Sequence, residues 1–97
     1  MGFSLSEQAV LDLVRIYKAG AIEFGLTQAE HYHQELDDVF DLISANPRLA
    51  RLRTELFHPV RVHRFRAHVI IYTVDDNDHV LVLRVRHGRE DWSAASG

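Results

Sequence analysis

The sequence contains no cysteine, which excludes disulfide bonds and thiolate chemistry and gives no sign of an oxidising compartment. No segment approaches the roughly 18 consecutive apolar residues that a membrane span requires, so we expect no association with a membrane. The first residues, MGFSLSEQ, lack the basic and apolar regions of a secretion signal. We therefore expect a cytoplasmic protein.

Several motifs that carry catalysis or bind metals are also missing. The five glycines are scattered and form no phosphate-binding loop, and there is no Gly-x-Ser-x-Gly motif. His31 and His33 lie two positions apart, so on a helix they point in different directions. His63 and His68 lack the acidic or sulfur-bearing neighbour that would complete a metal site. We predict no metal and no cofactor.

Lysine is nearly absent, because only Lys18 among the eleven basic residues is a lysine. Through Pro47 two basic residues stand against eight acidic ones, a balance of −6. From Arg48 onward nine arginines stand against six acids, a balance of +3, and the two sum to the net charge of −3. Arginine favours paired contacts with carboxylates or phosphates. The second half is therefore either a solvated face or a surface for an acidic partner, protein or nucleic acid.

Two amphipathic helices are predicted in the first half. Ser6 has the side chain to cap the first helix, and Gly25 ends it as a left-handed residue. The second opens at Thr27 in a capping box with Glu30 and stops at Asn46-Pro47. The first apolar stripe is expected at Ala9, Val10, Leu13, Val14, Tyr17, Ala21 and Phe24, and the second at Ala29, Tyr32, Leu36, Val39, Phe40 and Ile43.

Alternation of apolar and polar residues predicts three strands in the second half, at 60–65, 68–74 and 79–87. The turns at Arg66-Ala67 and Asp75–Asp78 are short, so these strands are antiparallel. Gly2–Leu5 is expected to add an edge strand, whereas Arg48–Pro59 receives no assignment. In the last strand one face is predicted to hold Leu81, Leu83 and Val85, and the other Val80, Val82, Arg84 and Arg86.

A chain of 97 residues has room for one core, so we expect one domain over residues 1–97, with 93–97 frayed. The elements predict an α+β fold in which an N-terminal αα-hairpin packs on a small antiparallel β-sheet, in the order β-α-α-β-β-β. A metal-free nuclease on this scaffold would need a base, an arginine for the phosphate and an acid. The candidates for these roles are Glu55, Arg64, Tyr72 and His87. The simpler interpretation is that all four are structural or surface residues.

Four short motifs occur along the chain in a distinctive order. They are Leu5-Ser6 before the first helix, Asn46-Pro47-Arg48 after the second, the strand HVIIY at 68–72, and His87 and Arg89 in a His-x-Arg close followed by an acid. Each motif is weak alone, but their order and spacing over about residues 3–91 resemble the ParE branch of the RelE/ParE superfamily. These proteins are the toxins of bacterial type II toxin–antitoxin systems.

The resemblance implies a toxin that inhibits DNA gyrase by binding, performs no chemistry itself and makes no direct contact with nucleic acid. It also implies a ParD-like antitoxin whose C-terminal segment covers the helices and the sheet edge. We expect the target-binding residues to be Arg84, Arg86, His87 and Arg89. The expected antitoxin-binding residues are Leu11, Val14, Ile22, Arg61 and Arg64.

Two alternatives stay open. The first is a ribosome-dependent mRNA endonuclease of the RelE type, with His87 and Arg64 as its main residues and Glu55 or Tyr72 as helper. The negative net charge argues mildly against it, since ribosome-directed members are commonly basic. The second is a protein of the same fold that has lost toxicity and serves as a binding module.

Overall fold

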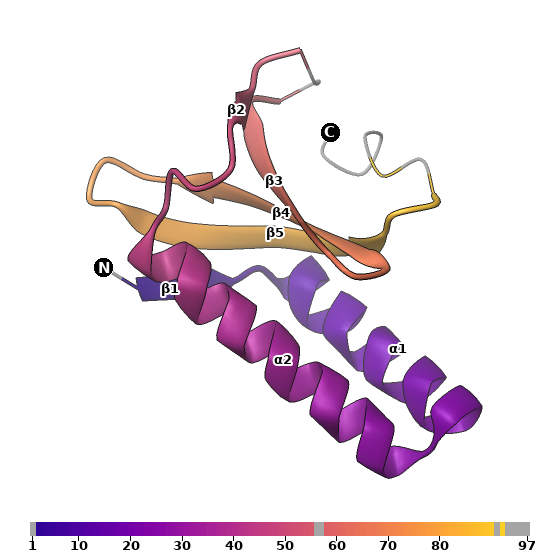
Figure 1. The fold of residues 1–97 in the computed structure, drawn as a ribbon. Coiled ribbons are helices and arrows are strands. Elements are labelled where there is room, and N and C mark those ends of the chain that lie inside the picture. Colours follow the sequence, from indigo (N-terminus) through magenta and orange to yellow (C-terminus); the bar gives the residue numbers. More distant parts are fainter. Residues whose placement is uncertain (1, 56–57, 91, 93–97) are drawn as a thin grey trace.

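The computed structural model describes residues 2–55, 58–90 and 92. The chain runs through β1 (Gly2–Leu5), α1 (Glu7–Phe24), α2 (Leu26–Ala45), β2 (Leu52–Arg53), β3 (Val60–Phe65), β4 (His68–Val74) and β5 (His79–His87). The helices form a hairpin on one face of a five-stranded sheet and diverge from it toward the hairpin tip (Figure 1). The predicted α+β fold is confirmed, whereas the tail at 93–97 lies outside the described residues.

The sheet contains one parallel pair. Its strand order is β1-β5-β4-β3-β2, and β1 runs parallel to β5, while the other neighbours are antiparallel. The prediction of an antiparallel sheet therefore holds for β2 to β5 and not for β1. The reason is that two helices follow β1, and they remove the constraint that a tight turn places on strand direction. β2, in the segment left unassigned, pairs with the start of β3.

Gly25 is the entire connection between the two helices. It ends α1 as predicted, with a φ of 95°, but its ψ of 162° lies outside the left-handed helical region. Because the connection is one residue long, α2 begins at Leu26, and no side chain caps it. The predicted capping box of Thr27 and Glu30 is therefore wrong. Ser6 caps α1 as predicted.

The buried face of α1 differs from the predicted stripe. Ala9 and Leu13 are buried, but Val10 and Val14 are 46% and 44% exposed. Asp12 lies on the buried face instead, only 3% exposed, because arginines of β5 compensate its charge. A hydrophobicity pattern counts this aspartate as polar and therefore rotates the predicted stripe away from it.

A β-bulge in β5 changes which of its residues face the helices. The pairing of β4 with β5 shifts by one residue between Ile71 and Tyr72, and Leu83 is the extra residue. Val82 before the bulge and Val85 after it both pack in the core beneath the helices. The prediction that these two valines face opposite ways is therefore wrong, because strict alternation makes no allowance for a bulge.

The main core lies between the helices and the sheet. The stripe predicted for α2 is confirmed, since Ala29, Leu36, Phe40 and Ile43 are buried. A smaller cluster packs on the other face of the sheet and contains Val60, Val62, Val69 and Ile71. None of the helices in the described part of the chain is long and apolar enough to cross a membrane.

Candidate functional site

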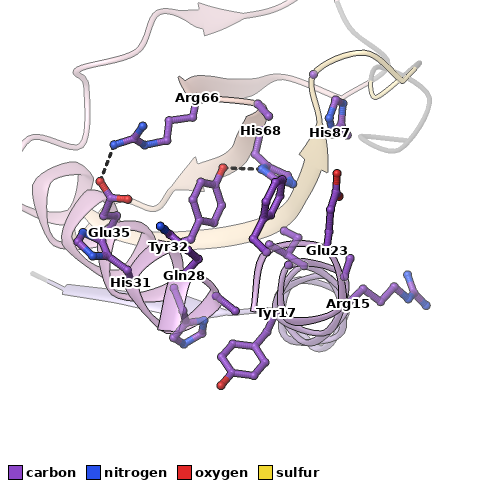
Figure 2. A pocket seen from close by; sticks show the side chains of 18 of the residues that line it. Arg15, Tyr17, Glu23, Gln28, His31, Tyr32, Glu35, Arg66, His68 and His87 are labelled. Atoms are coloured by element: carbon purple, nitrogen blue, oxygen red, sulfur yellow. Dashed lines mark hydrogen bonds and ion pairs between the residues drawn. The ribbon is translucent and has the colours of Figure 1, made fainter. Parts of the chain in front are cut away.

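A groove of about 1320 Å³ opens between the helical hairpin and one end of the sheet (Figure 2). One wall comes from α1 and α2, and the other comes from the β3–β4 turn and the end of β5. The fold thereby brings together basic and aromatic side chains that are far apart in the sequence. They include Tyr32, Arg64, Arg66, His68, His87 and Arg89.

Tyr32, His68 and His87 form a row of rings in this groove. The Tyr32 hydroxyl lies 2.6 Å from Nδ1 of His68, and the rings of His68 and His87 meet edge to face with centroids 5.5 Å apart. Burial, with a smaller electrostatic effect of His87, lowers the pKa of His68 below its usual value of 6.5. His68 is therefore neutral at pH 7 and serves the hydrogen bond to Tyr32.

Two arginines of the groove, Arg64 and Arg89, have no carboxylate partner among the residues that the structure describes. Arg66 pairs with Glu35 at 2.7 Å (Figure 2), whereas none of the ion pairs between described residues includes Arg64 or Arg89. Gly88 allows Arg64 to lie against the main chain, because a Cβ at this position would stand 2.7 Å from Nη1 of Arg64. Arg64 and Arg89 can therefore pair with carboxylates of a partner.

Asp12 of α1 binds the end of β5. Its carboxylate accepts hydrogen bonds from Nε and Nη2 of Arg84, at 2.8 and 3.0 Å, and from Nη1 of Arg86 at 3.3 Å. It also accepts the Val85 N–H at 3.0 Å. Burial would raise the pKa of Asp12, but the bonds from Arg84 and Val85 and the two guanidinium charges outweigh burial and lower it. Asp12 is therefore ionised at neutral pH.

The residues that follow β5 form a closed turn. Glu90 accepts hydrogen bonds from Nη2 of Arg86 at 2.6 Å and from the His87 N–H at 2.8 Å. The Arg89 N–H donates to Nδ1 of His87 at 3.1 Å, so the neutral imidazole carries its proton on Nε2. The Gly88 N–H donates to the β3–β4 turn at 2.7 Å. These bonds fix the backbone from which the side chains of His87 and Arg89 project.

The four predicted target-binding residues fall into two groups. His87 and Arg89 are exposed, while the side chains of Arg84 and Arg86 are only 18% and 24% exposed and bind Asp12. Sequence reasoning missed Asp12. Its signal was an acidic residue inside an apolar helical stripe, in a chain that also ends a strand with Arg-x-Arg.

The predicted antitoxin-binding residues also divide. Leu11 and Val14 are 47% and 44% exposed, and Ile22 is 88% exposed. Arg64 lines the groove, but Arg61 is half-buried and donates to a main-chain carbonyl before β2 at 2.6 Å. A second, smaller groove of about 360 Å³ is lined by α1, α2 and the end of β1, and includes Val14. Leu11, Val14 and Ile22 of α1 thus present apolar surface that is exposed in the described part of the chain.

The four residues considered for nuclease chemistry do not meet. Tyr72 is fully buried, and its hydroxyl donates to a main-chain carbonyl at 3.1 Å. Glu55 is exposed and pairs with Arg51 at 3.3 Å. Of the four, Arg64 and His87 line the groove. The described residues contain no group of three or more histidine, aspartate or glutamate side chains that could hold a metal ion.

Comparisons with known proteins agree over nearly the whole chain. A family model described as the ParE toxin of the type II toxin–antitoxin system parDE matches residues 3–92. Toxin ParE1 of Mycobacterium tuberculosis is 33% identical over 89 residues, which cover 92% of this chain and 91% of the relative. Toxin ParE3 of Caulobacter vibrioides is 29% identical over 86 residues, covering 89% and 85%.

A solved structure supports the fold. A chain of the chromosomal ParDE TA system from P. aeruginosa matches with a TM-score of 0.73, covering 90% of this chain and 95% of that chain. The two sequences are 19% identical, so this likeness concerns the arrangement of helices and strands.

Proposed function

This chain belongs to the ParE toxin family of type II toxin–antitoxin systems, and we propose that it inhibits bacterial DNA gyrase by binding it and that a ParD-like antitoxin neutralises it. The observation that carries the proposal is the extent of the family match, which covers residues 3–92. This range includes both helices, the strands β2 to β5, all of β1 except its first residue, and the turn after β5.

The uncovered apolar side chains of the hairpin support an antitoxin partner. Three apolar side chains of α1 are exposed to solvent although the other face of this helix packs on the sheet. They are Leu11, Val14 and Ile22. Apolar surface of this kind on a small protein favours a bound partner. Arg64 in the groove offers the same partner a guanidinium for a carboxylate. We infer an amphipathic, acidic antitoxin segment across α1 and the groove.

The turn after β5 is proposed as the contact to gyrase. His87 and Arg89 are exposed there, and Arg89 has no carboxylate partner among the described residues. Arg84 and Arg86 lie behind them and bind Asp12. We therefore assign direct contact to His87 and Arg89, and support of the turn to the other two arginines.

Inhibition by binding alone is favoured over nuclease chemistry. A nuclease of this fold would need an acid or base beside Arg64 and His87, but Tyr72 is buried in the core and Glu55 pairs elsewhere. The ring of His68 contacts that of His87, and Nδ1 of His68 is already engaged by the Tyr32 hydroxyl at 2.6 Å. In the described part of the chain, the four residues predicted for nuclease chemistry therefore do not come together.

A supercoiling and cleavage assay tests the proposal. Purified gyrase, ATP and relaxed plasmid are incubated with the protein freed of antitoxin, and DNA topology and protein-linked breaks are followed on gels. With the wild-type protein we expect supercoiling to be lost and DNA breaks to be trapped. With the double variant His87→Ala/Arg89→Ala we expect normal supercoiling and no trapped breaks. If the wild-type protein leaves gyrase unaffected, gyrase is not the target, and translating ribosomes become the next substrate to test.

A further inference from the structure

Asp12 is the one buried charged side chain among the residues that the structure describes. It lies on the second turn of α1, beside a part of β5 that pairs with β4 on one edge but has no strand partner on the other, because β1 ends where Leu5 pairs with Val82. Ser6 and Asp12 satisfy the main-chain groups on this edge. The Ser6 N–H donates to the Val82 carbonyl at 2.9 Å, and its hydroxyl donates to the Leu83 carbonyl at 2.7 Å. Asp12 accepts the Val85 N–H.

Arg86 extends this attachment beyond the strand. Arg84 and the Val85 N–H already give Asp12 three hydrogen bonds, which hold β5 against α1. Arg86 binds in two directions, with Nη1 on Asp12 at 3.3 Å and Nη2 on Glu90 at 2.6 Å. Its Nε is buried and has no hydrogen-bond partner in the described part of the chain. Arg86 is therefore a bridge between a buried carboxylate and an exposed one.

Glu90 connects Arg86 to the main chain of the turn after β5. Its second carboxylate oxygen accepts the His87 N–H at 2.8 Å, and its own N–H donates to the His87 carbonyl at 3.2 Å. The hydrogen bond from Arg86 lowers the pKa of Glu90, so the bridge is charged on both sides at neutral pH. The turn that presents His87 and Arg89 is thus connected to α1 through three side chains.

We propose that Asp12 is a positioning residue for the turn at 87–90, acting through Arg86 and Glu90. The inference rests on the proposed function, because it takes His87 and Arg89 as the contacts to the target. A turn that is ordered before binding loses less conformational entropy when it binds, and affinity rises accordingly. A carboxylate buried under α1 thereby sets the geometry of a surface that it does not touch.

Glu90→Ala tests the outer end of this connection, since Glu90 has a side chain that is 36% exposed. The matched control is Arg48→Ala, which removes another arginine–carboxylate pair, with Asp78 at 2.8 Å. Amide exchange is measured by NMR across β4 and at Gly88 and Arg89, whose N–H groups bond elsewhere than to Glu90. We expect about tenfold faster exchange at these two amides in Glu90→Ala alone, with β4 unchanged.

Asp12→Asn tests the inner end. The substitution keeps an acceptor for the Val85 N–H and removes the charge that holds both arginines. We expect the same local increase in exchange at Gly88 and Arg89, and an approximately tenfold higher concentration for half-inhibition of gyrase. If this variant does not fold, Glu90→Ala tests the proposal instead, by amide exchange at Gly88 and Arg89 and by the concentration for half-inhibition of gyrase.

Two results would overturn the proposal. Unchanged exchange at Gly88 and Arg89 in Glu90→Ala would mean that the bridge does not order the turn. An equal increase across β4 and the turn in Asp12→Asn, with Glu90→Ala still fully inhibitory, would mean that Asp12 serves global stability only. A wild-type protein without effect on gyrase would instead overturn the proposed function, and the exchange data would still decide whether Asp12 orders the turn.

Discussion

The carboxylate of Asp12 accepts the main-chain N–H of Val85 at 3.0 Å, across 73 positions of sequence. In a wider sheet this N–H would pair with a neighbouring strand, but β1 has already ended. A helix side chain therefore completes the edge of the sheet and satisfies a buried donor. Because the same carboxylate also binds Arg84 and Arg86, the packing of α1 and the charge balance of β5 depend on one residue.

Asp12→Ala should lower the free energy of unfolding by about 3 kcal/mol or more, because it leaves two partly buried guanidinium groups and the Val85 N–H without their hydrogen-bond acceptor. Urea denaturation followed by circular dichroism measures the change. Asp41→Ala, on the exposed face of α2, is the control and should stay within about 0.5 kcal/mol of the wild type. A cost below about 1 kcal/mol for Asp12→Ala would show that Arg84 and Arg86 find equivalent partners.

Stability should fall as the pH drops below about 6.5. The folded pKa of His68 is lowered by burial and by His87. The unfolded chain therefore binds a proton at His68 more readily than the folded chain, so acid stabilises the unfolded state relative to the folded state. The stability contribution is complete above the unfolded pKa near 6.5 and is lost as pH falls from there toward the folded pKa. Urea midpoints at several pH values measure it.

His68→Gln is the control for this pH dependence, because glutamine can keep a hydrogen bond to Tyr32 without titrating in this range. The variant should lose part of the slope and retain the part that comes from His63, whose pKa burial also lowers. An unaltered slope in His68→Gln would assign the whole effect to other groups.

Tyr72→Phe should reduce stability without reducing toxicity. The Tyr72 hydroxyl bonds to the Pro47 carbonyl at 3.1 Å and to the Ala50 N–H at 3.4 Å, so its loss should cost about 1 kcal/mol. Thermal unfolding and growth arrest after induction are the two measurements. A stable variant that no longer arrests growth would revive a chemical role for this hydroxyl and with it the nuclease alternative.

Replacing Leu11 and Val14 together by serine should change the free energy of unfolding by no more than about 0.5 kcal/mol, because both side chains are already half in water. Their neighbour Leu13 is buried, and Leu13→Ala should cost about 2–5 kcal/mol. The double variant should also bind the cognate antitoxin more weakly in calorimetry. Antitoxin affinity equal to that of the wild type would place the antitoxin interface elsewhere.

Local signals in the sequence were sufficient for most of the secondary structure. The strands at 60–65, 68–74 and 79–87 have the predicted bounds, because alternation and turn residues act over two to four neighbours. The predicted helix start at Thr27 was wrong, because α2 begins at Leu26. The capping pattern is a local signal, whereas the one-residue connection at Gly25 depends on how closely the two helices pack. The bulge at Leu83 also escaped the pattern, because it depends on the register of β4.

Local periodicity and motifs spread over the chain were enough to predict the order of helices and strands and the resemblance to ParE toxins. The fold sets which charged side chains a partner can reach. It buried Asp12 against Arg84, 72 positions away, left Arg89 exposed, and separated Tyr72 from His87. The physical reason is range: periodicity depends on neighbours a few residues apart, whereas an ion pair forms between whichever side chains the fold brings together.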